Sequence, residues 1–316
     1  MRIGTGRVAL RRTLVVLAGL GGVAGLAGAT TRAADEPEIA GRLRAHGVEV
    51  TVRDGIVVGA RADTLSKEGY RVVGECTSLR TLSVSGTAEP LSAETLPLLA
   101  GLVNLESLNT NQSRLADDDY RLFAPLRSLE RLALYHPSIR MPEFTGRGLA
   151  HLAALPALEE LTYAGTDTGD EALAAVGTLK GLRRFRTWHT AQTQAGMTHL
   201  ATLENLVALR LGQRLPGWGS PEPSFDGSTI PVIAGMKTLE QLELTEARLT
   251  AADLAPLAGL PKLRLLVITT VDIPPADVEK LRAELPGVKI EFTPLSDEER
   301  EKTLVKKLKV AEPARQ

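Results

Sequence analysis

Residues 158–166 read Leu-Glu-Glu-Leu-Thr-Tyr-Ala-Gly-Thr, and the same spacing of apolar residues returns 24 and 48 residues later, from Leu182 and Leu206. Comparable clusters begin at five further leucines: Leu79, Leu105, Leu129, Leu239 and Leu263. A unit of about 24 residues is too short to bury an apolar face unless another copy lies against it. The sequence therefore predicts a stacked array of about eight repeats over residues 79–292.

Each repeat is predicted to contain one strand and one short helix. In the spacing L-x-x-L-x-L, the last two apolar residues fall on one side of an extended segment and the residues between them fall on the other. Further along the repeat, apolar residues recur every three residues, as in Leu149, Leu152 and Leu155. That spacing is typical of one face of a helix. The expected fold class is therefore an α/β repeat solenoid.

Residues 158–166 and 79–87 resemble the L-x-x-L-x-L-x-G-T form of leucine-rich repeat proteins. With its 24-residue period, the chain resembles the bacterial branch of that family, which is common in exported proteins of Planctomycetes-like organisms. The resemblance covers about residues 56–292. It implies a right-handed coil with a parallel β-sheet on the concave face and short helices on the convex face.

The chain departs from the commoner family pattern in one position, eight residues after the first leucine of each cluster. The family usually has a buried Asn there, whereas this chain has Thr87, Ser113, Pro137, Thr166, Thr190, Arg214, Ala247 and Val271. The Asn ladder is therefore missing, and the resemblance leaves open how the turn after each strand is formed.

Both ends of the array are predicted to be capped. Residues 34–78 are expected to form a helix over about 36–46, a hairpin around Asp54-Gly55, and a first rung in which Val58 lies 24 residues before Leu82. Residues 293–316 are expected to contain a charged helix that begins with a capping box at Ser296 and Glu299. We expect this helix to cover the open end of the coil and residues 312–316 to be disordered.

Residues 1–33 are predicted to be a signal peptide. Arginines precede an uncharged stretch from Thr13 to Thr31 that ends in small residues, and this arrangement is typical of a cleaved export signal. Arg11-Arg12 also resembles a twin-arginine signal, and an uncleaved membrane tether is the alternative. We therefore expect an exported bacterial protein, periplasmic or extracellular, with no stable membrane insertion after cleavage. Because Cys76 is the only cysteine, an intrachain disulfide is excluded.

The sequence offers no catalytic, metal or cofactor motif. His151 and His199 occupy equivalent positions two repeats apart, too far from each other to share a metal ion. The run Asp117-Asp118-Asp119 is interpreted as a solvated helix start rather than a calcium site. Removing residues 1–33 would change the formal net charge from −1 to −6, which argues against nucleic-acid binding. We expect a protein that is not an enzyme and has no cofactor.

The outward positions of the middle strands are unusual because they combine arginine with aromatic residues, the side chains that most often carry binding energy. The repeats after Tyr135 and Gly212 also exceed 24 residues by five and nine, so two long loops should rise along one rim. These loops contribute His136, Arg140, Trp218 and Phe225. A basic, aromatic-lined recess is predicted from eight residues: Arg131, Tyr135, Arg184, Arg186, Trp188, His189, Arg210 and Trp218.

Such a recess suits an acidic peptide, a carboxylated glycan or another anionic polymer. The function predicted from the sequence is therefore a non-enzymatic binding module that recognises a protein or an anionic polymer through its concave face and one loop rim. Two alternatives stay open. In the first, the long loops are only tolerated insertions, and Glu160 and Glu243 neutralise the basic patch. In the second, the array is a structural component of the cell envelope that acts through self-association.

Overall fold

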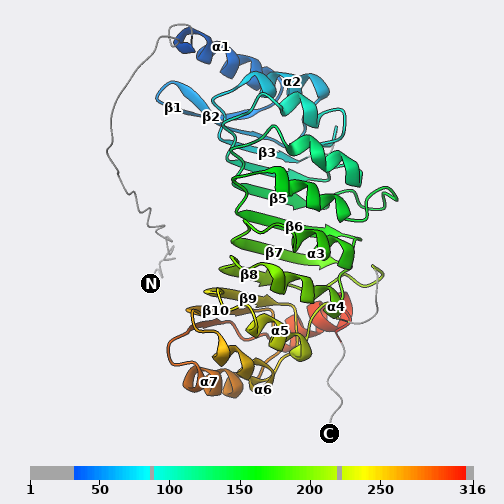
Figure 1. The fold of residues 1–316 in the computed structure, drawn as a ribbon, viewed down its shortest axis with the longest axis vertical. Coiled ribbons are helices and arrows are strands. Elements are labelled where there is room, and N and C mark those ends of the chain that lie inside the picture. The colour runs from blue at the N-terminus through cyan, green and yellow to red at the C-terminus, as the bar shows by residue number, and fades with distance from the viewer. Residues whose placement is uncertain (1–31, 86–88, 219–222, 311–316) are drawn as a thin grey trace, which may run out of the picture.

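The computed structural model describes residues 32–85, 89–218 and 223–310, and residues 32–37 by their backbone alone. Within this part of the chain, strands β1 to β11 form a single sheet in which their order follows the sequence (Figure 1). β1 runs antiparallel to β2, and the ladders from β2 to β11 are parallel. The strands are β1 (Glu49–Arg53), β2 (Ile56–Ala62), β3 (Thr81–Ser85), β4 (Ser107–Asn111), β5 (Arg131–Tyr135), β6 (Glu160–Thr166), β7 (Arg184–Thr190), β8 (Ala208–Leu211), β9 (Gln241–Thr245), β10 (Leu265–Thr269) and β11 (Lys289–Phe292).

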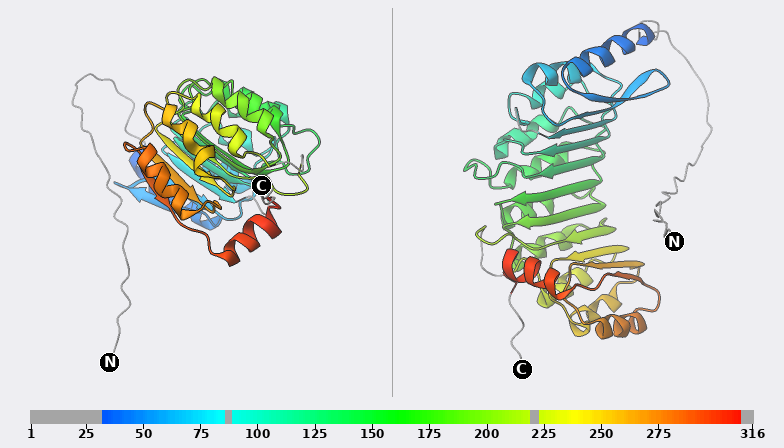
Figure 2. Two further views of the ribbon diagram at one scale, coloured as in Figure 1. Left: turned by 90° about the horizontal axis from the view of Figure 1, so that it is seen from below. Right: turned by 180° about the vertical axis from the view of Figure 1, so that it is seen from behind.

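Short helices form the second layer, and Figure 2 shows them stacked along the sheet from one end of the coil to the other. Most are one or two turns long, and many are wound as 3₁₀ helices. They are α1 (Arg32–Ala45), α2 (Lys67–Glu75), η1 (Leu96–Leu99), η2 (Asp117–Phe123), η3 (Arg147–Ala154), α3 (Asp170–Val176), α4 (Gln194–Met197), η4 (Thr198–Thr202), η5 (Gly227–Thr229), α5 (Ile230–Ala234), α6 (Ala251–Leu254), η6 (Ala255–Gly259), α7 (Pro275–Glu284), α8 (Asp297–Glu299) and η7 (Arg300–Lys307). The predicted leucine-rich repeat solenoid is confirmed.

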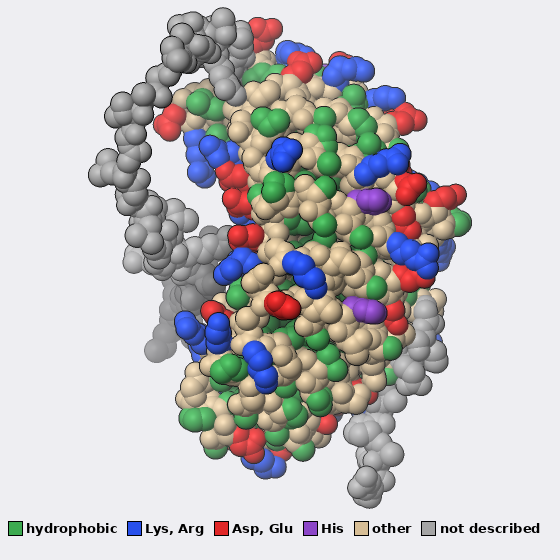
Figure 3. Space-filling view, viewed as in Figure 1, with side chains coloured by type: hydrophobic (Ala, Val, Ile, Leu, Met, Phe, Trp, Pro, Cys, Tyr) green, Lys and Arg blue, Asp and Glu red, His purple; other side chains and the backbone are tan. Residues whose placement is uncertain are grey.

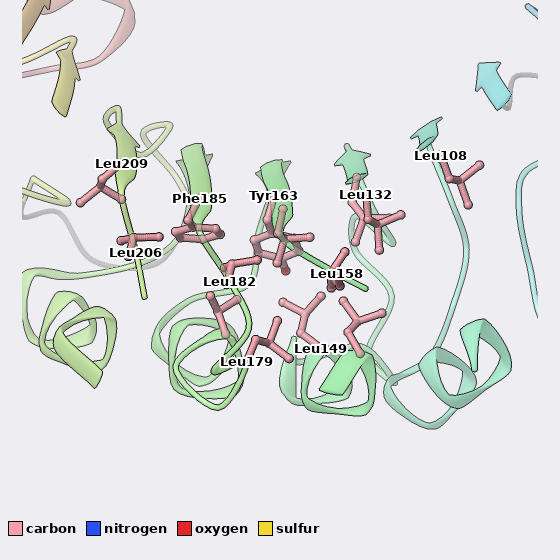
Figure 4. Close-up of a cluster of buried hydrophobic side chains, with 14 of the residues drawn as sticks. Leu108, Leu132, Leu149, Leu158, Tyr163, Leu179, Leu182, Phe185, Leu206 and Leu209 are labelled. Carbon is pink, nitrogen blue, oxygen red and sulfur yellow. The ribbon is translucent and has the colours of Figure 1, made fainter. Parts of the chain in front are cut away.

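The core lies between the two layers and is continuous along the coil. Leu108, Leu132, Leu161, Phe185 and Leu209 are cross-strand partners in successive ladders, and each is at most 2% exposed. Leu149 of η3 and Leu179, which follows α3, point toward the same space from the opposite side (Figure 4). Each repeat therefore buries its apolar residues against the repeats on either side, as the 24-residue period requires.

The turns after the strands are formed without an Asn ladder. A residue at the end of the strand adopts a positive φ in several repeats: Gln112, His136, Glu246 and Thr270 directly follow their strands, and His189 is the next-to-last residue of β7. In this conformation the backbone N–H of His136 donates to the Ala164 carbonyl, and that of His189 donates to the Gln213 carbonyl. Each hydrogen bond joins one repeat to the next, so backbone groups connect these repeats where no Asn side chain does.

Aspartates at helix starts form a second connection between repeats. Asp117 accepts hydrogen bonds from the backbone N–H groups of Thr145, Gly146 and Gly148 and from the Thr145 hydroxyl, at 2.8–3.1 Å. Two repeats further on, Asp170 accepts hydrogen bonds from the N–H group and the hydroxyl of Thr193 in the same way. The acidic run at 117–119 begins a helix, as interpreted from the sequence, but Asp117 is half-buried and hydrogen-bonded to the next repeat rather than solvated.

The N-terminal cap contains the predicted hairpin, but the register between its second strand and β3 differs from the predicted one. Asp54 and Gly55 both have positive φ, as a two-residue hairpin turn requires. β2 also pairs with β3 and is the first rung, but Ala60 rather than Val58 lies opposite Leu82. The register prediction was wrong by two residues because this rung is shorter than the 24-residue period. α1 begins at Arg32, ahead of the expected helix.

The C-terminal helical segment does not cover the open end of the coil, and that expectation was wrong. Its capping box forms as predicted, with Ser296 and Glu299 hydrogen-bonded to each other. The segment then folds back along the rim to which the strands point (red in Figure 2). There the Arg214 guanidinium donates to the Leu308 carbonyl, and Arg300 pairs with Asp272 at 3.0 Å. Leu304 and Leu308 are fully buried in this position, and the burial of these two apolar side chains explains why the segment packs on the rim.

The predicted signal peptide and disordered tail lie outside the described residues, apart from the backbone at the start of α1. Among the helices that are described, none has both the length and the apolar character needed to cross a bilayer.

Candidate binding surface on the concave face

Six of the eight predicted site residues lie together on the outward positions of β5, β7 and β8. The ladders place Arg186 directly opposite Arg210 on the next strand, and they place Ala164 of β6 between Tyr135 and Trp188. This placement follows from the alternation within each strand, because the residues between the core positions must face outward. The sequence prediction located these six side chains correctly.

The aromatic residues form the centre of this surface. The ring centroids of Tyr135 and Trp188 are 6.0 Å apart at an interplanar angle of 56°, in the range favoured by aromatic pairs. Ala164, which is 1% exposed beneath them, leaves the space that allows the two rings to approach. The Arg210 guanidinium carbon lies 4.6 Å from the Trp188 ring centroid, a cation–π contact. We call Tyr135, Trp188, Arg186 and Arg210 the central patch.

Three of the four arginines at outward positions of β5, β7 and β8 are neutralised by nearby carboxylates. Arg131 pairs with Glu130 at 2.8 Å, Arg184 pairs with Glu160 at 3.1 Å, and Arg210 pairs with Glu243 at 3.3 Å. Arg186 differs, since it is exposed and none of the described residues gives it a carboxylate partner. The alternative of a patch neutralised by Glu160 and Glu243 therefore holds for Arg184 and Arg210 but not for Arg186.

A groove runs from the central patch toward the C-terminal strands. It encloses about 130 Å³ and has Arg186, Arg210 and Glu243 on one side and Leu265 and Val267 of β10 on the other. The two aliphatic residues did not enter the sequence prediction. Apolar side chains at outward positions of a strand were the signal that could have found them.

Along the rim, His189 is held by a residue two strands away. Its Nε2 lies 3.0 Å from Oε1 of Glu246, and both side chains are largely buried, with 19% and 13% exposed. Gly212 of the intervening repeat lies beneath this contact. A Cβ at Gly212 would lie 2.6 Å from the Trp188 Cβ and 3.0 Å from Oε2 of Glu246. His136, on the first long loop, pairs through Nδ1 with Oδ1 of Asn111 at 2.8 Å.

The described residues on either side of positions 219–222 in the second long loop include some that are packed into the coil. Phe225 is fully buried, so its predicted contribution to the rim was wrong. The side-chain amide of Gln213 holds this loop, since it donates to the Phe225 carbonyl at 2.7 Å and accepts from the Ser224 N–H at 2.8 Å. Trp218 is half-buried, and no aromatic or cation–π contact joins it to the central patch in the described part of the chain.

The remaining polar clusters lack comparable organisation. His151 and His199 are exposed on the helix layer, and no group of three or more His, Cys, Asp or Glu residues is arranged to hold a metal ion in the described ranges. On the face shown in Figure 3, acidic and basic side chains are interspersed, and neither sign forms a continuous patch.

Comparisons with known proteins show similarity to other leucine-rich repeat coils. An internalin from Listeria monocytogenes is 18% identical, with 87% of this chain and 79% of that one covered and a TM-score of 0.45. Internalin C2 from the same species is 15% identical, with 82% and 93% covered and a TM-score of 0.42. A leucine-rich repeat protein of Leptospira interrogans is 16% identical, with 73% and 70% covered and a TM-score of 0.35. No family model and no curated protein matches the chain.

Proposed function

We propose that this protein is a non-enzymatic binding module that takes an anionic ligand on the central patch. The observation that carries the proposal is Arg186, an exposed guanidinium with no carboxylate partner among the described residues and with a second arginine directly opposite it. The charge of Arg210 is already compensated by Glu243, whereas that of Arg186 is not, so a bound anion would supply the partner that Arg186 lacks. Arginine also binds carboxylates with two parallel hydrogen bonds, which gives direction as well as affinity.

The surroundings of Arg186 favour a peptide or polymer over a free small anion. Trp188 and Tyr135 provide an aromatic surface next to the charge, and the groove continues to Leu265 and Val267. A ligand that combines carboxylates with aliphatic groups, such as an acidic peptide segment, fits both features. A carboxylated glycan fits the charge and the aromatic surface. Because interface energy concentrates in few Trp, Tyr and Arg residues, the central patch is the expected hot spot.

The setting proposed for this activity is outside the bacterial cytoplasm. That part of the proposal rests on the export signal predicted in residues 1–33, with the mature protein in the periplasm or the exterior. Self-association as a component of the envelope is the competing function, and the same experiment separates the two.

The test measures binding of poly-glutamate, oligogalacturonate and poly-lysine by isothermal titration calorimetry. We expect the two polyanions to bind and poly-lysine not to bind. The variant Arg186→Ala should weaken polyanion binding by roughly tenfold or more, as expected for a lost charged hydrogen-bond pair. Arg147→Ala is the matched control, because Arg147 is exposed on η3 and pairs with Glu171.

Raising the salt concentration should weaken the interaction further, since exposed charges are screened. Equal loss in both arginine variants would contradict a site at the central patch. Concentration-dependent self-association without polyanion binding would favour the assembly function.

A further inference from the structure

We infer that the protein has a second ligand site, a recess under the N-terminal hairpin that takes an uncharged, hydroxyl-rich ligand such as a neutral oligosaccharide. The recess encloses about 470 Å³, which is within the range of small-molecule sites. It lies where β1 extends the concave face of β2, β3 and β4. It shares no lining residue with the groove at Arg186, so it does not depend on the function proposed above.

The lining of the recess includes five side chains that both donate and accept hydrogen bonds. These five have no hydrogen-bond partner in the described part of the protein: Thr51, Thr81, Ser83, Ser107 and Asn109. The backbone of β2, β3 and β4 is not available to a ligand, because these strands are paired on both sides. Recognition in this recess therefore falls to hydroxyl and amide side chains.

Gly59 opens the floor of the recess. It lies between Thr51 and Thr81 in the ladders of β1 and β3. A Cβ at Gly59 would lie 2.9 Å from Oγ1 of Thr81 and 3.2 Å from Oγ1 of Thr51. The two threonine side chains thus converge over residue 59, and they can do so because it has no side chain. The ladder shifts register directly after Thr51, and such irregularities re-aim side chains.

The balance of charge in the recess points to a neutral ligand. Its ionised lining residues are Glu49 and Arg61, which lie opposite each other on β1 and β2 and have opposite signs. Arg61 is also 3.5 Å from Asp63, outside the lining. Sugar hydroxyls donate and accept in the same way as the Thr, Ser and Asn groups that line the recess. A peptide that extends the sheet would need a free strand edge, and among the lining strands only β1, at the end of the sheet, has one.

The test is saturation-transfer NMR of the full chain with three neutral trisaccharides, maltotriose, cellotriose and chitotriose, each up to about 10 mM, as suits a weak site. Trigalacturonate and tri-serine are the acidic and peptide comparisons. We expect at least one neutral trisaccharide to bind. Gly59→Ala, which fills the floor, and Thr51→Val/Thr81→Val, which removes two hydroxyls at nearly constant shape, should each weaken binding by roughly tenfold.

Two controls keep the test specific. Gly41→Ala makes the same substitution where an added Cβ meets nothing within 4 Å, and Arg186→Ala removes the charge at the other site. Both should bind the neutral sugar like the unmodified protein. The inference is overturned if none of the three neutral sugars binds, if binding is unchanged in both recess variants, or if tri-serine binds as tightly. A loss on Arg186→Ala would instead place the sugar on the central patch.

Discussion

Nε2 of His189 lies 3.0 Å from Oε1 of Glu246, although His189 belongs to the strand β7 and Glu246 follows β9, 57 residues later. The contact passes over the repeat of β8, where Gly212 leaves the necessary space. The same glycine borders Trp188, so one position without a side chain shapes both the rim and the central patch. The repeat array thus brings together residues two rungs apart by means of a gap in the rung between them.

The first prediction concerns that gap. Gly212→Ala should destabilise the protein by about 1–3 kcal/mol, the usual cost of extra volume in a packed site. The added Cβ would push against the Trp188 Cβ at 2.6 Å, and a backbone-adjacent atom has little freedom to move away. Urea unfolding measures the change. Gly41→Ala should leave the unfolding midpoint unchanged or raise it, because an added Cβ meets no neighbour there. An equal loss of stability in both variants would show that the loss does not come from a clash with Trp188.

The second prediction tests the aspartate contacts between repeats. Asp117→Ala removes the acceptor of four hydrogen bonds from the next repeat and should cost about 2 kcal/mol or more. Asp118→Ala, one residue along, should have little effect, because Asp118 is exposed and accepts no hydrogen bond from a described residue. The comparison uses the free energy of unfolding from urea titrations. Equal effects would mean that Asp117 acts only through its charge at the helix start.

Repetition explains why so much of this fold was predictable from the sequence. A leucine such as Leu182 occupies the same environment as its equivalents in the neighbouring repeats, so each repeat confirms the interpretation of the next. The outward positions followed from alternation alone, and this placed Arg186 and Trp188 correctly. The features that escaped prediction occur once in the chain. The burial of Phe225 depends on the contact between Gln213 and the backbone of residues 224–225. The path of the C-terminal segment depends on the contact between Arg214 and Leu308, and no periodicity encodes either contact.

The third prediction concerns the response to alkaline pH. Burial raises the pKa of Tyr120 well above its usual value, and burial also raises the pKa of Tyr163. Since the folded-state pKa values lie above the unfolded value of about 10, stability is complete below pH 10 and is lost as the pH rises beyond it. The melting temperature should therefore fall between about pH 9 and pH 11 by more than carboxylate titration can explain, because carboxylates are already ionised there.

Tyr120→Phe separates this effect from general alkaline damage. The Tyr120 hydroxyl is buried without a hydrogen-bond partner in the described structure, so its removal should leave stability at pH 7 unchanged or slightly higher. The variant should also lose less stability above pH 10 than the unmodified protein. Its ring stacks on Phe144 at a centroid distance of 5.4 Å, and phenylalanine preserves that contact. A marked loss of stability at pH 7 would show that the hydroxyl has a partner.

The last prediction concerns the C-terminal segment on the rim. Leu304→Ala/Leu308→Ala should release this segment from the loop that carries Arg214, because the two leucines are its fully buried side chains. Each substitution removes about 2–5 kcal/mol of packing where the site cannot collapse. Because the segment is terminal, the loss should appear first as local opening rather than as global unfolding.

Hydrogen exchange resolves the two cases. In the double variant, amides of residues 296–308 and of the loop around Arg214 should exchange faster, whereas amides of β3 to β7 should stay protected. Lys302→Ala is the control, since Lys302 is exposed on the same segment and should leave every rate unchanged. A segment that covered the open end of the coil would instead leave the loop around Arg214 protected and expose β11. The Arg214–Leu308 contact predicts that the loop around Arg214 loses protection and β11 keeps it. Arg214 is 3% exposed while the segment covers it, so release of the segment exposes this loop to solvent.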